Sequence, residues 1–189
     1  MTQEQIVEHF RSCGALLEGH FLLSSGLHSR QYLQCAIALQ YPADAQRFAR
    51  QIADHFLASE IDTVASPAIG GLVLGYAVAA ALNVRFIWTE RQKGTMTLRR
   101  GFSVKPDERL LVVEDVVTTG GSTRECIAAV EDLGAVVVGA ASLIDRSNGA
   151  ADVGVPRISL ANFEVPSYPP VSCPMCAFGS VPEKPGSRQ

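Results

Sequence analysis

Two adjacent acids, Glu114 and Asp115, stand between a short apolar run and a turn rich in hydroxyl groups and glycines. The full string reads Val112-Val113-Glu114-Asp115-Val116-Val117-Thr118-Thr119-Gly120-Gly121-Ser122. The N–H groups and hydroxyls of such a turn, with the partial positive charge at the start of the following helix, can bind a phosphate. Gly120 and Gly121 let the backbone approach a ligand closely because they have no Cβ atom.

The string is not one of the common nucleotide-binding motifs. It lacks both the G-x-x-x-x-G-K-[ST] of a Walker loop and the G-x-G-x-x-G of dinucleotide-binding proteins. It places two acids beside a site for one phosphate, which favours a ribose phosphate as ligand, with or without a divalent cation. The alternative is that Glu114 and Asp115 only end a strand and cap a helix, as an isolated Glu-Asp pair would.

The segments around this string alternate between short apolar strands and helices. We predict strands at 63–65, 85–89, 109–113 and 136–144, and helices at 43–57, 72–82 and 122–133. Such alternation is typical of βαβ units, so the predicted fold class is a doubly wound α/β domain with a mostly parallel sheet. Ligands of such folds bind beyond the carboxyl ends of the strands. Three loops at those ends, 66–71, 90–101 and 114–122, should converge on one site.

The two ends of the chain depart from this alternation. Thr2 and Gln5 predict a capping box that begins a helix to about residue 13, and residues 19–29 predict a hairpin. Residues 32–39 are expected to be extended. Six of the ten prolines lie from Pro166 onward, which predicts an irregular tail over about 166–189. We therefore expect a single domain over 1–189, with a small N-terminal part at about 1–40.

Composition and charge exclude several classes of protein. The chain has 189 residues, of which 47% are hydrophobic and 19% charged, as in globular domains. A net charge of −3 offers no overall positive field for nucleic acid. The longest nearly apolar stretch, 71–82, is too short to span a membrane, and the first residues lack a signal-peptide pattern. A soluble, cytoplasmic protein is expected.

Positive charge gathers between residues 85 and 100, where five basic residues accompany the single acid Glu90. The basic residues are Arg85, Arg91, Lys93, Arg99 and Arg100. This local excess suits a small, highly anionic ligand. The alternative is an ordinary solvated loop.

The tail contains a C-x-x-C pair, Cys173 and Cys176, among five cysteines in the chain. Such a pair supplies half of a zinc site, but neither a second pair nor a suitably spaced histidine follows it. The sequence therefore favours structural or incidental cysteines and predicts no direct metal ligand from the protein. Whether this pair binds a metal is left open.

The string around the two acids resembles the signature of the type I phosphoribosyltransferases, which bind 5-phosphoribosyl 1-pyrophosphate (PRPP). The resemblance implies the corresponding fold, a requirement for Mg²⁺, and ribose hydroxyls held by Glu114 and Asp115. It further implies a 5′-phosphate cradled by Val116, Val117, Thr118, Thr119, Gly120, Gly121 and Ser122.

Within that superfamily the chain is similar to the orotate phosphoribosyltransferases. Residues 19–29 match the hood over the base, 66–71 the pyrophosphate loop, 90–94 the start of the mobile loop, and 143–146 a strand that ends in a substrate-binding arginine. The resemblance implies that orotate displaces pyrophosphate from PRPP and gives orotidine 5′-monophosphate in pyrimidine biosynthesis. It also implies a homodimer whose mobile loop reaches the partner's site, the alternative being a monomer with a flexible loop.

Particular residues receive roles from this resemblance. Arg146 would bind the carboxylate of orotate, for which a planar guanidinium is suited, although it could instead pair with Asp145 or the tail. Thr118 would contact the base edge. Arg91 and Lys93 would neutralise the departing pyrophosphate, and Asp115 would orient the ribose and stabilise positive charge on its ring.

The chain departs from the family at two loops. Many members have a lysine in place of Ser24 and a Tyr-Lys pair in place of Ala68-Ile69. Their absence gives more of the pyrophosphate binding to Arg91, Lys93 and the backbone of residues 70–71. The C-x-x-C pair is likewise not general in the family.

Two other functions remain open. One is the same chemistry on a purine or another pyrimidine, which would not need Arg146 to recognise a carboxylate. The other is a non-catalytic regulator that keeps the fold as a ligand sensor and binds RNA or DNA. The chain has neither an added helix-turn-helix nor a basic patch of the kind that would support the regulator.

Overall fold

The computed structural model describes residues 1–23 and 25–185, so Ser24, one of the two departures from the family, lies outside the described residues. In this part of the chain six strands form the main sheet, in the order β5-β4-β3-β6-β7-β8. β5 is antiparallel to β4, and the other neighbours are parallel. The strands are β3 (Thr63–Pro67), β4 (Arg85–Gln92), β5 (Thr95–Leu98), β6 (Arg109–Val117), β7 (Val136–Asp145) and β8 (Arg157–Asn162).

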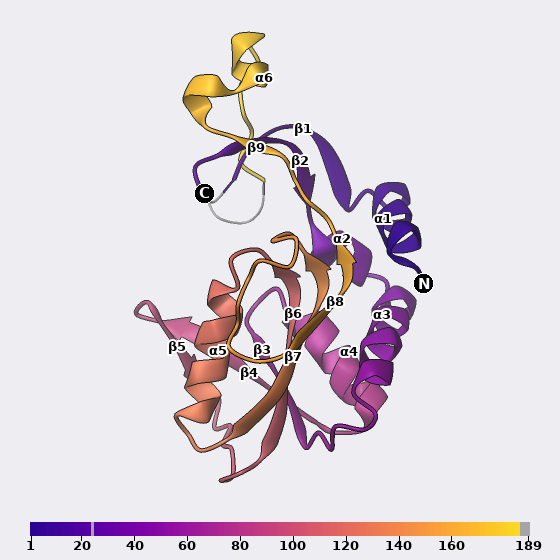
Figure 1. The fold of residues 1–189 in the computed structure, drawn as a ribbon, viewed down its shortest axis with the longest axis vertical. Coiled ribbons are helices and arrows are strands. Elements are labelled where there is room, and N and C mark those ends of the chain that lie inside the picture. The colour runs from indigo at the N-terminus through magenta and orange to yellow at the C-terminus, as the bar shows by residue number, and fades with distance from the viewer. Residues whose placement is uncertain (24, 186–189) are drawn as a thin grey trace.

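Helices cover both faces of this sheet because its central strands are apolar on both sides. Along β6, Leu111 and Val113 pack toward α3 (Pro42–His55) and α4 (Leu72–Leu82). The alternate residues Leu110 and Val112 pack toward α5 (Gly121–Glu131) on the opposite face (Figure 1). All four side chains are fully buried, as expected for a parallel sheet covered on both sides. The predicted doubly wound α/β fold is confirmed.

A second, smaller sheet joins the two ends of the chain. After α1 (Gln3–Ser12), which begins with the predicted capping box, β1 (Leu16–Leu22) and β2 (His28–Leu33) form an antiparallel hairpin. The short strand β9 (Ser167–Tyr168) from the tail adds to β2. The tail continues through the 3-10 helix η1 (Pro170–Ser172) and α6 (Pro174–Ala177). This assembly lies beyond the carboxyl ends of the parallel strands (Figure 1). We call β1 and β2 the hood.

Several expected segments differ from the structure. Of residues 32–39, only Tyr32 and Leu33 are extended, because β2 ends at Leu33 and Cys35–Leu39 form the helix α2. The alanines and leucine there favour a helix, and Cys35, Ala38 and Leu39 bury one of its faces. The edge strand β8 was not predicted. Residues 90–98 form the β4–β5 hairpin rather than an open loop.

The central strand β6 is longer than predicted and includes both acids. It pairs with β7 through Val117, with Glu114 opposite Ser142 and Val116 opposite Ile144. The acids therefore point to opposite faces of the sheet. No helix in residues 1–23 or 25–185 is long and apolar enough to cross a membrane.

Candidate active site

The turn from β6 into α5 encloses a cavity of about 240 Å³, which we call the phosphate cavity. Gly120 caps the helix with a φ of +75°, a conformation that L side chains rarely adopt. A Cβ atom there would also lie 2.8 Å from Cγ1 of Val153. The lining brings together nearly all predicted phosphate and ribose ligands: Glu114, Val116, Val117, Thr118, Thr119, Gly120, Gly121 and Ser122, with Thr123, Glu125 and Arg91.

Glu114 faces the phosphate cavity from the α5 side of the sheet. Its Oε2 accepts a hydrogen bond of 3.1 Å from the Thr123 hydroxyl, and the residue is 9% exposed. Burial, with the neighbouring charge of Asp115, raises the pKa of Glu114 to about 8. Without a ligand, the protonated form of this carboxyl is therefore favoured at neutral pH.

Asp115 faces a second and larger cavity, which we call the loop cavity. This cavity measures about 860 Å³ and is lined by residues of α2, of the loop after β3, of β4 and by Asp115. A Cβ atom at Gly70 would lie 2.6 Å from Oδ1 of Asp115, and one at Gly71 would lie 2.8 Å from the carbonyl oxygen of Val113. Glycines thus allow this loop, which contains a cis peptide bond between Ala68 and Ile69, to contact β6 directly. Burial raises the pKa of Asp115 as well.

Most of the basic residues of the β4–β5 region are engaged in ion pairs. Arg99 and Arg100 both pair with Glu90, and Arg85 pairs with Glu108. Hydrogen bonds from Arg100 and from the Trp88 indole lower the pKa of Glu90 to about 2. Of the basic cluster in the sequence, Arg85 and Arg99 are accordingly ordinary paired charges, whereas Arg100 is paired and also lines the loop cavity.

Arg91 and Lys93 lie differently, although both belong to the same hairpin. Arg91 lines both cavities and pairs with Glu125 on α5. Lys93 and Gly94 form the exposed turn between the strands, with φ values of +49° and +88°. Lys93 lines neither cavity, so the structure brings Arg91 to the site but not Lys93.

Arg146 follows β7 and does not pair with Asp145. That aspartate instead accepts hydrogen bonds from Arg157, at 2.9 Å, and from Ser147. Within residues 1–23 and 25–185, the buried Nε of Arg146 has no hydrogen-bond partner. Burial lowers the pKa of this guanidinium, while Tyr32 and Cys35 act in the opposite direction. Arg146 therefore lies beneath the hood with an unused donor.

Similarity to known proteins identifies the family to which this arrangement of residues belongs. A family model described as a phosphoribosyl transferase domain matches residues 38–164, which contain both cavities apart from Gln34 and Ala36. The chain is 51% identical to the orotate phosphoribosyltransferase of Pelotomaculum thermopropionicum, over 100% of both chains. It is 50% identical to that of Chlorobaculum parvum, over 100% of this chain and 97% of that one. The chain belongs to the orotate phosphoribosyltransferase family.

Solved structures agree with the fold of this phosphoribosyltransferase. The orotate phosphoribosyltransferase from Aeropyrum pernix superposes with a TM-score of 0.69 at 28% identity, covering 84% of this chain and 93% of that one. An adenine phosphoribosyltransferase from Thermoanaerobacter pseudethanolicus has a TM-score of 0.60 at 19% identity, covering 70% and 88%. The fold by itself therefore does not identify the base.

One group of polar side chains in this phosphoribosyltransferase was missed in the sequence. His20 and His28 of the hood meet Cys173 and Cys176 of the tail, and their ligand atoms lie within 4.8 Å of one another. All four residues lie outside the segment that the family model matches. A second pair of ligands was expected only downstream of the C-x-x-C pair. The two histidines lie upstream instead, on the two strands of a predicted hairpin.

Proposed function

We propose that the protein transfers the phosphoribosyl group of PRPP to orotate in pyrimidine biosynthesis. The bond from C1′ to pyrophosphate breaks, the bond from C1′ to a ring nitrogen of orotate forms, and the products are pyrophosphate and orotidine 5′-monophosphate. The observations that carry this proposal are the phosphate cavity with Glu114 and the loop cavity with Asp115 on the other face of β6. Beside them lies Arg146, whose backbone N–H donates to the Val117 carbonyl and whose buried Nε has no hydrogen-bond partner among the described residues. The full-length similarity to orotate phosphoribosyltransferases supports it.

PRPP would be bound by β6 and the turn after it. Residues 116–122 would bind the 5′-phosphate through backbone N–H groups, hydroxyls and the start of α5. Glu114 and Asp115 lie on the two faces of one strand, so ribose at its end would meet both carboxyls. A protonated Glu114 can donate one hydrogen bond to a ribose hydroxyl and accept others. Its ionised form would stabilise positive charge that develops on the sugar ring.

The protein supplies positioning and charge rather than a nucleophile. Arg91, which already lines both cavities, would neutralise the departing pyrophosphate. Lys93 would do the same after the hairpin moves or from a second subunit. Closure of such a hairpin would exclude water from the reacting sugar.

The residues at the site also fit Mg²⁺. This ion favours oxygen ligands and commonly binds through one or two carboxylates together with substrate phosphates, keeping several water molecules. Glu114 in the phosphate cavity and Asp115 in the loop cavity offer carboxyl oxygens at the end of the same strand without forming a complete protein cage. Bound Mg²⁺ would offset the charge of pyrophosphate, and both carboxyls would contribute to holding it, directly or through water.

Arg146 and Thr118 would select the base. A guanidinium binds a carboxylate through two parallel hydrogen bonds, and the half-buried position of Arg146, with its buried Nε, strengthens such a pair. The absence of an ion pair with Asp145 removes the main competing role for this side chain. Thr118 lies in the exposed turn after β6, where its hydroxyl can reach the edge of a base.

We also propose a homodimer in the cytoplasm. Large apolar side chains are exposed around α4 and the loop before it, with exposed fractions of 83% for Ile69, 50% for Val73 and 67% for Tyr76. Such a surface favours a protein partner, and a second copy would place the Lys93 turn near another site. All five cysteines are free thiols, as in proteins of reducing compartments.

Pyrophosphate release tests the reaction and the substrate together. Purified protein would receive PRPP and Mg²⁺ with orotate, uracil, adenine or hypoxanthine in separate assays. We expect release with orotate alone. Release with another base would keep the role of the phosphate cavity and exclude the role of Arg146. Binding of PRPP without pyrophosphate release in the presence of any of the four bases would support a non-catalytic ligand sensor.

Mixing two inactive variants tests the shared loop. Lys93→Ala and Asp115→Asn chains, combined and allowed to exchange subunits, would regain about a quarter of the original activity, because half of the dimers are mixed and each has one intact site. A mixture that stays inactive while forming mixed dimers would show that each loop serves its own subunit.

A further inference from the structure

We propose that His20, His28, Cys173 and Cys176 bind one Zn²⁺ ion that joins the hood to the tail. The donors are the Nε2 atom of His20, the Nδ1 atom of His28 and the two Sγ atoms. His20 Nε2 lies 2.9 Å from His28 Nδ1 and 3.5 Å from Cys173 Sγ. Cys176 Sγ lies 3.3 Å from His28 Nδ1 and 3.9 Å from His20 Nε2.

These distances are close to those of a tetrahedral zinc site. With Zn–N of about 2.0–2.1 Å and Zn–S of about 2.3 Å, tetrahedral angles separate two nitrogens by about 3.4 Å and a nitrogen from a sulfur by about 3.6 Å. The observed nitrogen–sulfur distances of 3.3–3.9 Å bracket the second value, and the nitrogen pair needs to open only slightly. Two sulfurs and two imidazoles in a closed set favour zinc over harder cations.

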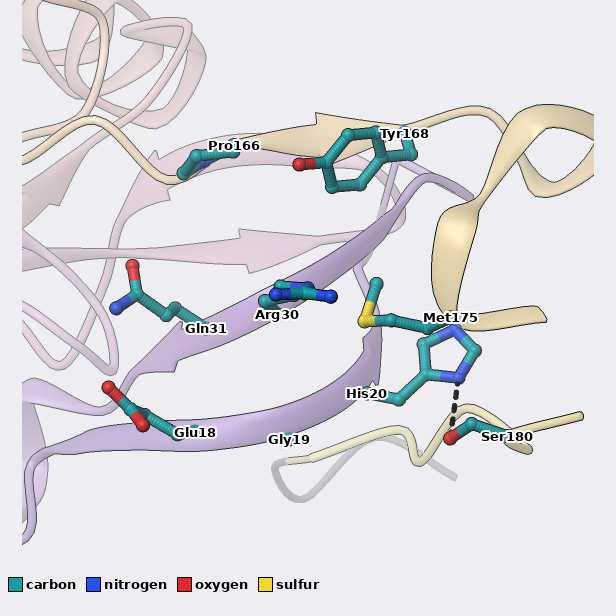
Figure 2. A pocket seen from close by; sticks show the side chains of 9 residues that line it. All are labelled: Glu18, Gly19, His20, Arg30, Gln31, Pro166, Tyr168, Met175 and Ser180. Carbon is teal, nitrogen blue, oxygen red and sulfur yellow. Dashed lines mark hydrogen bonds between the residues drawn. The ribbon is translucent and has the colours of Figure 1, made fainter. Parts of the chain in front are cut away.

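A hydrogen bond outside the set orients one of the ligands. The other ring nitrogen of His20, Nδ1, lies 3.1 Å from the Ser180 hydroxyl, and Figure 2 shows the ring held toward this serine. Ligating histidines usually donate this second N–H to an oxygen, which fixes the tautomer and leaves the other nitrogen free to bind the metal. Ser180 therefore favours coordination through Nε2, the atom that faces the other three ligands.

The charge of the set suits its burial. His20, His28 and Cys173 are each less than 9% exposed. Two thiolates and two neutral imidazoles balance the charge of one Zn²⁺, so the complete site carries no net charge into the interior. Without an ion, two buried imidazoles and two thiols would share only weak hydrogen bonds.

The described part of the tail, 166–185, contributes no residue to the two apolar cores that would hold it in place by itself. Its elements are two to four residues long, and β9 contributes two ladder pairs to β2. Between hood and tail lies a cavity of about 630 Å³, lined by His20, Tyr168, Met175 and Ser180 among others (Figure 2). Small units without a sufficient core commonly depend on a metal or on disulfides. The metal would join segments that are about 150 residues apart in the chain.

The main alternative is a disulfide between Cys173 and Cys176. It would leave His20 and His28 buried with no metal and no oppositely charged partner. The zinc proposal uses all four groups together, so the two alternatives differ in metal content, in thiol count and in dependence on the histidines.

Metal analysis of the purified protein tests the proposal directly. Elemental analysis after gel filtration should find about one zinc per chain. Replacement by Co²⁺ should produce the visible absorption and the thiolate charge-transfer band of tetrahedral cobalt. Less than about a tenth of an equivalent of zinc, together with no cobalt spectrum after refolding with Co²⁺, would overturn the proposal. So would a disulfide between Cys173 and Cys176, detected as two fewer thiols when protein purified without reductant is titrated after denaturation with a chelator.

Variants assign the ligands. Cys173→Ser combined with Cys176→Ser should abolish zinc and cobalt binding, and His20→Ala should weaken both strongly. Cys13→Ser is the matched control, since this half-buried thiol lies outside the cluster and its loss should leave one zinc bound. Full zinc content in the double variant would contradict the assignment. Because the metal content of the unmodified protein is measured first, a variant that fails to fold does not leave the question open.

Discussion

The phosphate cavity and the hood–tail cluster are built in opposite ways. The cavity uses consecutive residues of one strand, one turn and one helix, fixed by a sheet whose central residues are fully buried. The cluster uses two pairs of residues from the two ends of the chain, in a region with a small apolar core. A site on a rigid core keeps its geometry without its ligand, whereas a site made by distant segments depends on whatever joins them.

Because of this difference, we expect the two regions to recognise different substrates. Recognition of PRPP would rest on the rigid part, and recognition of the base would rest on the hood with Arg146 beneath it. β2 continues directly into α2, which lines the loop cavity with Ala36 and Leu39. Changes to the two regions should therefore affect the two substrates separately.

Among these changes, Arg146→Ala should produce the largest difference between the effect on orotate and the effect on PRPP. Removal of one partner of a buried charged pair costs roughly 2–5 kcal/mol. That is about a thirtyfold to several-thousandfold fall in kcat/KM for orotate. Affinity for PRPP, measured by calorimetry without orotate, should change less than about twofold, since Arg146 lies outside the phosphate cavity.

Arg30→Ala is the control for this variant, because Arg30 is an exposed arginine of the hood. It should leave kcat/KM near the original value. Equal losses for orotate and PRPP in Arg146→Ala would show that this arginine supports the fold rather than the base.

Gly120→Ala should act on the other substrate. A left-handed conformation costs a residue with a Cβ atom roughly 1–2 kcal/mol. The added methyl would also lie 2.8 Å from Val153 Cγ1 and displace the turn that binds the phosphate. We expect a rise of about tenfold or more in the dissociation constant of PRPP, measured by calorimetry.

Gly149→Ala is the control that separates backbone strain from an effect on PRPP binding. Gly149 has a φ of +83°, and no atom lies within 4 Å of the position that an added methyl would take, so it shares only the backbone penalty. It should lower the free energy of unfolding by a similar amount while PRPP affinity stays unchanged. A loss of PRPP affinity in both variants would mean that general destabilisation, and not the shape of the turn, weakens binding.

Zinc removal should have a smaller effect, confined to the hood. This expectation combines the proposed zinc site with the proposed function. Protein freed of zinc by chelation, then separated from the chelator and assayed with Mg²⁺, should show a KM for orotate raised by about five- to tenfold, since Tyr32 and α2 would lose their fixed position. The dissociation constant of PRPP should stay within about twofold, and limited proteolysis should cut the tail after residue 165 first. An equal weakening of both substrates would show that the hood and the core unfold together.

The sequence predicted the first region far better than the second. The string from Val112 to Ser122 lies in consecutive positions, so its chemistry and its location are both visible in one stretch. The end of β6 was predicted wrongly, since the strand continues through both acids because β7 pairs with it that far. As a consequence Asp115 lines the loop cavity and not the phosphate cavity. The pairing of Arg99 and Arg100 with Glu90 depends on a hairpin that the basic loop did not suggest.

The second region could not be derived from local patterns. His20 and Cys173 are brought together by antiparallel pairing of β2 with a two-residue strand from the tail, for which no periodicity exists to detect. The helix α2 was mistaken for an extended segment because five residues are too few to show a helical period. Tertiary contacts determine both the His–Cys cluster and the helix α2, and these contacts join residues that no single window of the sequence contains.

A pH-dependent effect on stability concerns the proton on Glu114. Its pKa is raised to about 8 in the folded protein, against 4.5 as its ordinary value. The folded state thus holds a proton that the unfolded chain releases between these two values, so the free energy of unfolding without ligand should fall as pH rises from about 4.5 to 8. Chemical denaturation at several pH values measures this slope. Glu114→Gln, which is neutral throughout, should make this slope clearly shallower and leave the part that comes from the buried Asp115.

Glu125→Gln is the matched control, since this glutamate lines the same cavity but pairs with Arg91. It should keep the slope. If Glu114→Gln also kept the original slope of the free energy of unfolding against pH, Glu114 would not be the group that holds the proton in the folded state. With PRPP and Mg²⁺ bound, the ionised form of Glu114 should be favoured, and the slope of the complex should be smaller than that of the free protein. A proton release on PRPP binding near pH 7, detected by calorimetry in buffers of different ionisation enthalpy, would connect the buried acid to the ligand it is proposed to hold.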